Sequence, residues 1–166
     1  MIKNLKLTVS VLFLFSAYSL SAQNVEKRTD LTQVGALKLA EQARIEAAKL
    51  YQNVSVAVLN SSGVTLLLLK GDNVGTHNTE ASRRKAYTAI STKTASWDLM
   101  HLAAQSKDAN NLNTLPELLL LGGGVPIWKD GALVGSIGVS GAGGGENDHN
   151  VALKAIKNIG FTTQSP

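Results

Sequence analysis

Residues 118–145, LLLLGGGVPIWKDGALVGSIGVSGAGGG, contain ten of the fifteen glycines of this 166-residue chain. Residues 118–121 are a short apolar run, typical of a strand that is buried on both faces. Residues 125–128 and 133–139 follow as two more strands, and Lys129-Asp130-Gly131 between them is a common hairpin turn. The segment therefore predicts three consecutive strands of an antiparallel sheet.

Glycines inside the last of these strands indicate that another group approaches the sheet closely. Gly135 and Gly138 each weaken a strand by about 0.5–1 kcal/mol relative to alanine, so a packing reason is expected. Either a tightly packed helix or a flat ligand would supply that reason. Pro126, which follows a run of three glycines, indicates a strand edge or a bulge.

The rest of the chain supplies the other layers of the fold. Apolar residues recur at spacings of three and four up to about residue 51, which predicts a helix capped by Thr32. Residues 54–59 and 64–69 are strands joined by a short polar hairpin. Further helices are expected near residues 79–91, 96–104 and 147–159. The predicted fold class is α/β of the α+β type, a five-stranded antiparallel sheet flanked by helices.

The first 22 residues have the features of a signal peptide. Lys3 and Lys6 precede a short apolar run, and small residues stand before a cleavage site after Ala22. The apolar run is too short to span a membrane comfortably, and no second one follows it. The sequence therefore predicts an exported protein, periplasmic or secreted, with no membrane span in the mature chain.

The remaining 144 residues are the size of one domain. We expect a loose lead-in at residues 23–30, the domain itself at residues 31–160 and a polar tail at residues 161–166. The chain has no cysteine, which excludes thiolate metal sites, c-type haem attachment and a cysteine nucleophile. Basic residues form no stripe interleaved with aromatic residues, so nucleic acid is not an expected partner.

Residues suited to catalysis are few, which favours a ligand-binding protein over an enzyme. The sequence lacks the G-x-S-x-G, H-E-x-x-H and phosphate-loop motifs. His77 follows a glycine-containing loop, and Glu80, Arg84 and Lys85 come one or two helical turns later. A neutral imidazole there could ligate haem iron while Arg84 or Lys85 paired with a propionate. An exposed loop histidine is the alternative for His77.

The other two histidines have plainer interpretations. His101 stands three residues after Asp98, a spacing that permits a surface pair, although a small tilt of the helix could turn it toward a cavity. His149 lies beside Asp148 and Glu146 at the start of the last helix. These three residues could ligate a metal, but solvated residues at a helix start are the expected arrangement.

Several of these segments together resemble the GlcG/HbpS family of haem-degrading and haem-binding proteins. They are V-S-V-A-V-L-N-S-S-G at residues 54–63, R-R-K-A-Y-T-A at 83–89, L-G-G-G-V-P-I at 121–127 and G-S-I-G-V-S-G at 135–141. The resemblance covers about residues 31–160 and implies a profilin-like or PAS-like domain that forms oligomers. It also implies binding of haem or a corrinoid, since one branch is the C-terminal domain of PduO-type proteins, and a sensor or transport partner.

The resemblance predicts an accessory protein that binds haem, or a related tetrapyrrole, non-covalently for sensing, storage or uptake, and the signal peptide predicts that it is exported. His77 is the predicted iron ligand. The other candidate binding residues are Glu80, Arg84, Lys85, His101, Gly122, Gly123, Gly124 and Pro126. An acid pair found in some family members would need an acid at position 83, where this chain has Arg83. Two alternatives stay open: an enzyme that degrades haem or acts on a small organic acid, and a ligand-free interaction module for a sensor.

Overall fold

The computed structural model describes residues 28–165, so the predicted signal peptide and most of the predicted lead-in lie outside the described residues. The elements follow the predicted order of helix, strands, helices, strands and helix, except that two strands, and not the predicted three, precede the last helix. They are α2 (Gln33–Ala48), β1 (Ser55–Asn60), β2 (Thr65–Leu69), α3 (His77–Thr92), α4 (Ser96–Gln105), α5 (Lys107–Asn110), a 3-10 turn (Asn111–Thr114), β3 (Gly124–Lys129), β4 (Ala132–Ser140) and α6 (Gly145–Asn158).

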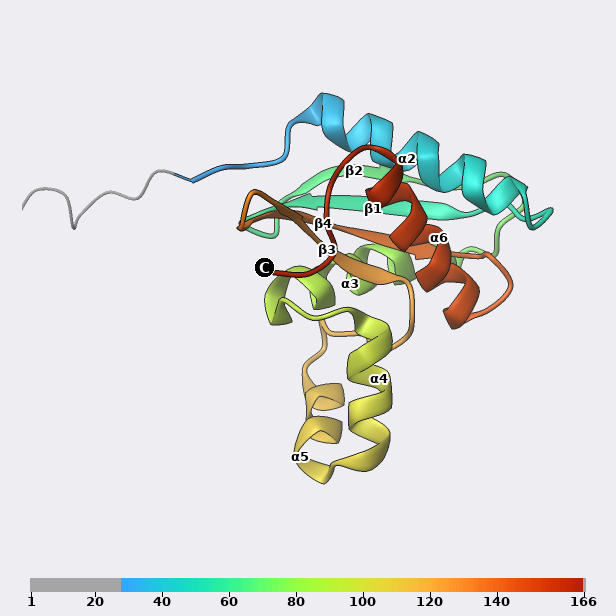
Figure 1. Ribbon diagram of the computed structural model, residues 1–166. Helices are drawn as coiled ribbons and strands as arrows, with labels where there is room; N and C mark the ends of the chain where they lie inside the picture. The colour runs from blue at the N-terminus through green and yellow to red at the C-terminus, as the bar shows by residue number, and fades with distance from the viewer. Residues whose placement is uncertain (1–27, 166) are drawn as a thin grey trace, which may run out of the picture.

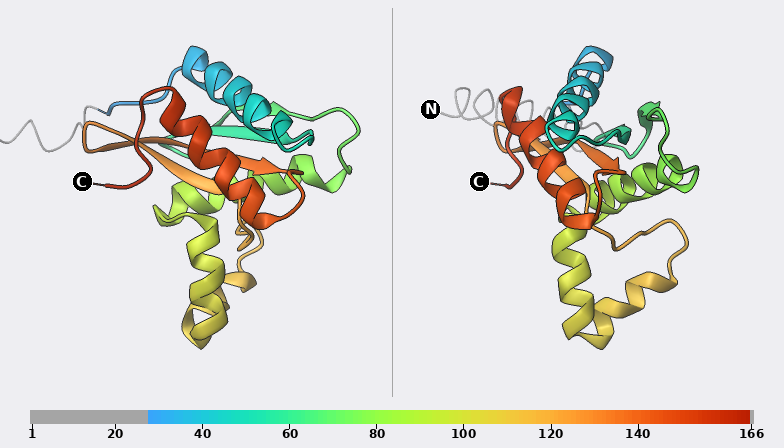
Figure 2. Two further views of the ribbon diagram at one scale, coloured as in Figure 1. Left: turned by 45° about the vertical axis from the view of Figure 1, so that its right-hand side comes forward. Right: turned by 90° about the vertical axis from the view of Figure 1, so that its right-hand side faces the viewer.

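The strands form one antiparallel sheet in the order β2-β1-β4-β3, with helices on both faces. Helices α2 and α6 cover one face and α3 covers the other (Figures 1 and 2). Alternate residues of β1 face the helices on the two sides of the sheet. Val56 and Val58 belong to the larger core beneath α2 and α6, whereas Ala57 and Leu59 pack beneath α3.

The prediction of a fifth strand at residues 118–121 was wrong, because this apolar run pairs with side chains rather than with a strand. Thr88 Oγ1 on α3 accepts a hydrogen bond from the backbone N–H of Leu119 (2.8 Å). Leu118 and Leu120 are buried in a small cluster with Leu99 of α4. The run is apolar because this cluster buries it, and the sheet formed by residues 28–165 has four strands.

The glycine of β4 that faces α3 is explained by tight helix packing, one of the two predicted reasons. A Cβ at Gly138 would overlap the carbonyl oxygen of Ser82 on α3, and one at Gly124 of β3 would overlap the carbonyl oxygen of Lys85. Ser136 Oγ also donates to the carbonyl oxygen of Ala86 (2.8 Å). The backbone of α3 therefore lies directly on the sheet.

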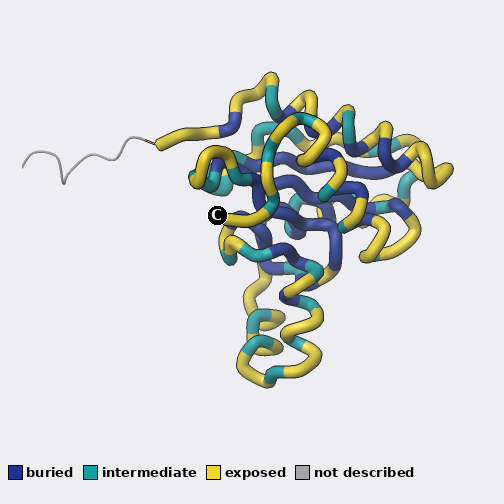
Figure 3. The backbone as a smooth tube through the Cα atoms, in the orientation of Figure 1, coloured by how far each residue is buried: buried dark blue, intermediate teal, exposed yellow. Residues whose placement is uncertain are grey.

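Helices α4 and α5 and the 3-10 turn project from this layered body as an arm (Figures 1 and 2). Most of the arm is exposed, whereas the buried residues concentrate in the sheet and the inner faces of its helices (Figure 3). None of the helices within residues 28–165 is long and apolar enough to cross a membrane.

Replacing Gly138 with alanine should lower the free energy of unfolding by about 1–3 kcal/mol, because the new methyl group would push α3 away from the sheet. Chemical denaturation measures this change. Gly35→Ala is the matched control: Gly35 lies in α2, and its nearest obstacle is the flexible end of Leu31 at 3.0 Å. Equal free energies of unfolding for the two variants would contradict the packing argument.

Candidate functional site

Lys85 lies inside the fold, where it holds α3 to α6. Its side chain is only 4% exposed. Its Nζ donates to Asp148 Oδ2 of α6 at 2.8 Å, to the carbonyl oxygen of Val139 at 3.1 Å and to Ser140 Oγ at 3.2 Å. The ammonium group is therefore fully used by protein partners, and it does not face a ligand.

The other charged residues predicted on α3 are also engaged by the protein. Arg84 donates through Nη2 to the carbonyl oxygen of Leu118 (2.7 Å). Glu80 pairs with Arg83 at 2.7 Å, and Arg83 also reaches Glu117 at 2.8 Å. The hydrogen-bonded guanidinium of Arg83 holds the pKa of Glu80 below its ordinary value. A cation at position 83 thus joins two carboxylates from different segments.

The structure separates the predicted iron ligand from the other predicted site residues. His77 is exposed at the first residue of α3, and Pro126 is buried in β3. Gly122, Gly123 and Gly124 are buried. A Cβ at Gly122 would overlap the carbonyl oxygen of Gly145 and come within 2.6 Å of the Trp97 ring, so this glycine makes room for the protein's own backbone and an indole.

A pocket of about 410 Å³ opens at the β3 edge of the sheet, and we call it the β3-edge pocket. It lies where α4, α6, the end of α3 and the C-terminal tail meet around β3. Pro126 is the one predicted site residue that lines it. The lining residues are Lys93, Thr94, Ala95, Asp98, Val125, Pro126, Trp128, His149, Leu153, Lys157, Thr163, Gln164 and Ser165.

His149 of α6 is the residue of this pocket that is best suited to ligate a metal. Its ring stacks on Trp97 of α4, with centroids 6.0 Å apart and planes 21° apart. His101 meets the same indole edge-on at 4.5 Å but is itself exposed. Burial lowers the pKa of His149, and the carboxylate of Asp98 opposes that shift in part. The imidazole is therefore neutral at pH 7, the state that binds metals.

Two polar atoms of the pocket's side chains are buried without a partner among the described residues. They are Nδ1 of His149 and Nε1 of Trp128. Unpaired buried polar atoms are rare in proteins and often mark a place where a ligand or water belongs. The backbone of Trp128 is itself held, because it exchanges two hydrogen bonds of 2.9 and 3.0 Å with Thr162 of the tail.

The rest of the pocket combines apolar walls with free cations. Val125, Pro126 and Leu153 provide apolar surface beside the Trp128 ring. Lys93 and Lys157 are exposed, and neither forms an ion pair within the part of the chain that the structure describes. A flat, partly apolar molecule that carries acidic groups suits these walls and cations.

Local sequence patterns did not reveal His149 as a site residue. It lies next to Asp148 in a stretch with the usual acidic start of a helix, and that pattern favours capping. Only the fold brings His149 onto Trp97, which is in a different helix. Asp148 is the partner of Lys85, and residues 28–165 contain no group of three or more ligands that could hold a metal ion.

A family model described as "Haem degrading protein HbpS-like" matches residues 31–157. The crystal structure of a double mutant of HbpS from Streptomyces reticuli superposes with a TM-score of 0.76 at 36% identity, covering 82% of this chain and 92% of that one. The crystal structure of a PduOC–haem complex gives a TM-score of 0.75 at 25% identity, covering 82% and 100% of the two chains.

Curated relatives include much longer proteins. The corrinoid adenosyltransferase PduO of Salmonella typhimurium is 28% identical over 128 residues, which are 76% of this chain and 38% of that protein. PduO of Citrobacter freundii is 27% identical over 82% of this chain and 43% of its own length. This chain therefore spans about two fifths of the length of the PduO relatives.

Replacing Lys85 with methionine should lower the free energy of unfolding by about 3–5 kcal/mol, because it leaves Asp148 buried and unpaired. Urea denaturation measures the loss. Lys129→Met is the matched control, since Lys129 is exposed and forms a loose pair with Asp130 at 3.8 Å. This substitution should lower the free energy of unfolding by less than about 1 kcal/mol. Similar losses in both variants would show that the buried pair is not needed for stability.

The stability of the protein should fall as the pH drops below about 6.5, the ordinary pKa of histidine. The folded state depresses the pKa of His149, so the unfolded chain binds a proton at a higher pH than the folded one and acid favours unfolding. The stability should stop falling once the pH lies below the pKa of His149 in the folded state. Thermal unfolding of His149→Gln should lack this step, and His77→Gln should keep it; the same step in both variants would exclude His149 as its source.

Proposed function

Because this chain belongs to the HbpS-like family, we propose that it binds haem non-covalently in the β3-edge pocket. The PduOC–haem complex, which has the same fold, supports haem as the ligand. The residues that line the β3-edge pocket support this location for the haem. Non-covalent attachment agrees with a sequence that contains no cysteine for a thioether link.

The observation that carries this proposal is His149, a neutral imidazole that has no hydrogen-bond partner in the described chain and lies against Trp97. Haem iron takes an axial ligand, most often a histidine nitrogen. The stacked indole limits the rotation of the imidazole, so the ligand is oriented before haem arrives. Such pre-orientation reduces the entropy that binding would otherwise lose.

The other residues of the pocket match the remaining parts of the haem molecule. Trp128, Pro126 and Leu153 would contact the apolar ring. The free ammonium groups of Lys93 and Lys157 would pair with the two propionates at the open side. When bound, haem would supply an iron centre that binds small ligands or exchanges electrons.

His77 remains the competing iron ligand. It stands at the first residue of α3, and Lys93 of the pocket directly follows the last residue of that helix. Sixteen residues at 1.5 Å per residue place them about 24 Å apart. One haem cannot use both ends of α3, so variants of the two histidines separate the two sites cleanly.

The broader roles remain part of the same proposal. Export, a role in sensing, storage or uptake, assembly into an oligomer and a sensor or transport partner are predictions from the sequence and its family resemblance. Corrinoid is the alternative tetrapyrrole, suggested by the adenosyltransferase relatives. A corrinoid has more bulk above and below the plane of its ring than haem has. Competition between a corrinoid and bound haemin would show whether one pocket binds both.

Titration of the purified protein with haemin, followed by the Soret band, should saturate at one haem per chain. His149→Ala should shift the band and weaken binding by about tenfold or more, because the iron loses its protein ligand. His77→Ala is the matched control and should leave both the band and the affinity unchanged. A band altered by His77→Ala but not by His149→Ala would move the site to the other end of α3, and uptake that does not saturate would overturn haem binding itself.

A further inference from the structure

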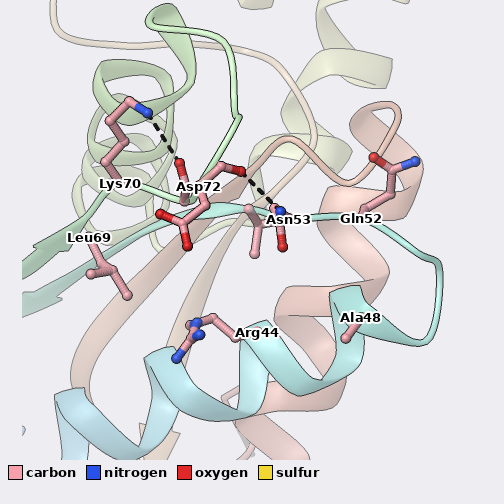
Figure 4. A pocket seen from close by; sticks show the side chains of 9 residues that line it. Arg44, Ala48, Gln52, Asn53, Leu69, Lys70 and Asp72 are labelled. Atoms are coloured by element: carbon pink, nitrogen blue, oxygen red, sulfur yellow. Dashed lines mark hydrogen bonds between the residues drawn. The ribbon is translucent and has the colours of Figure 1, made fainter.

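A second pocket, of about 330 Å³, lies at the opposite edge of the sheet, and we call it the β2-edge pocket (Figure 4). The end of α2 forms one wall, and the segment that follows β2 forms the other. Its lining residues are Arg44, Ala48, Gln52, Asn53, Val54, Leu69, Lys70, Gly71 and Asp72. None of them belongs to the β3-edge pocket.

Two opposite charges face each other across this pocket without forming an ion pair. The guanidinium of Arg44, on α2, and the carboxylate of Asp72 lie on opposite sides of the pocket (Figure 4). The salt bridges of the described residues include none between them. Arg44 uses only Nη1, which donates to Glu41 at 2.9 Å, and the Asp72 carboxylate accepts no hydrogen bond within residues 28–165. The Asp72 carboxylate, and the Nε and Nη2 atoms of Arg44, are therefore available to a ligand.

The segment that carries Asp72 is held in place. The backbone carbonyl oxygen of Asp72 accepts a hydrogen bond from Asn53 Nδ2 at 3.0 Å. A Cβ at Gly71 would come within 2.5 Å of the carbonyl oxygen of Val54, so the segment lies tightly against the start of β1. The ammonium group of Lys70 turns to the carbonyl oxygen of Gly71 at 3.2 Å and away from Arg44 (Figure 4). The gap between Arg44 and Asp72 therefore carries one charge of each sign.

Apolar surface lies beside the two charges. Leu69 lines the pocket and keeps 38% of its surface exposed, and Ala48 and Val54 also line it. An exposed leucine at this position would gain from burial by about 25 cal/mol for each Å² of apolar surface covered. The pocket thus offers a cation, an anion and an aliphatic wall within one small volume.

We propose that the β2-edge pocket binds a free α-amino acid with an aliphatic side chain, in its zwitterionic form. The carboxylate would take the free nitrogens of Arg44, whose planar fork suits a carboxylate. The ammonium group would pair with Asp72, and the side chain would cover Leu69. A ligand without the ammonium group would leave Asp72 without a partner, and one without the carboxylate would leave Arg44 with Glu41 alone.

Isothermal titration of the purified protein with L-leucine tests this assignment. L-leucine should bind saturably at one site per chain. 4-Methylpentanoate, which lacks the ammonium group, and 3-methylbutylamine, which lacks the carboxylate, should each bind about tenfold more weakly or worse. Arg44→Gln and Asp72→Asn should each weaken leucine binding by a similar factor.

Glu41→Gln is the matched control, because it removes the competitor for Arg44 without touching the pocket, and it should keep or tighten leucine binding. The absence of saturable leucine binding, equal affinity for 4-methylpentanoate, or unchanged binding by Arg44→Gln would each overturn the proposal. Haemin binding should be the same in wild type and in Arg44→Gln, so this test succeeds or fails independently of the haem site.

Discussion

The buried pair of Lys85 and Asp148 is the constraint on which the arrangement of the site depends. It joins α3 on one face of the sheet to α6 on the other, through the end of β4. Asp148 also accepts a hydrogen bond from the backbone of Ala142 at 2.7 Å, so the loop before α6 is fixed by the same carboxylate. His149 is the next residue, and its place against Trp97 follows from where Asp148 is held. A residue that resembles a ligand-binding cation in the sequence therefore acts by positioning the site.

The sequence predicted the layers and the two hairpins well because their signals are local. Strands expected at residues 54–59 and 64–69 lie at Ser55–Asn60 and Thr65–Leu69, and the helix expected near residues 79–91 is His77–Thr92. The apolar run at residues 118–121 was mistaken for a strand because hydrophobicity reports burial and not the identity of the partner. Here the partners are Thr88 and a leucine cluster beneath α4.

The site was harder to predict because its residues come from four separate segments. Pro126, which we predicted as a site residue for its backbone properties, lines the β3-edge pocket. The three glycines marked a close approach correctly, but the approaching groups are the protein's own helices and the Trp97 ring. Nothing near His149 in the sequence distinguishes a pocket residue from an ordinary helix start. Lys93 and Lys157, likewise, become neighbours only through the fold.

The central claim is that haem occupies the β3 edge of the sheet, with its iron on His149. A crystal structure of the protein grown with haemin tests this claim most directly. The account predicts iron bonded to a nitrogen of His149, the ring against Trp128 and Pro126, and the propionates toward Lys93 and Lys157. Haem bonded to His77 at the other end of α3, or held away from this pocket altogether, would contradict it.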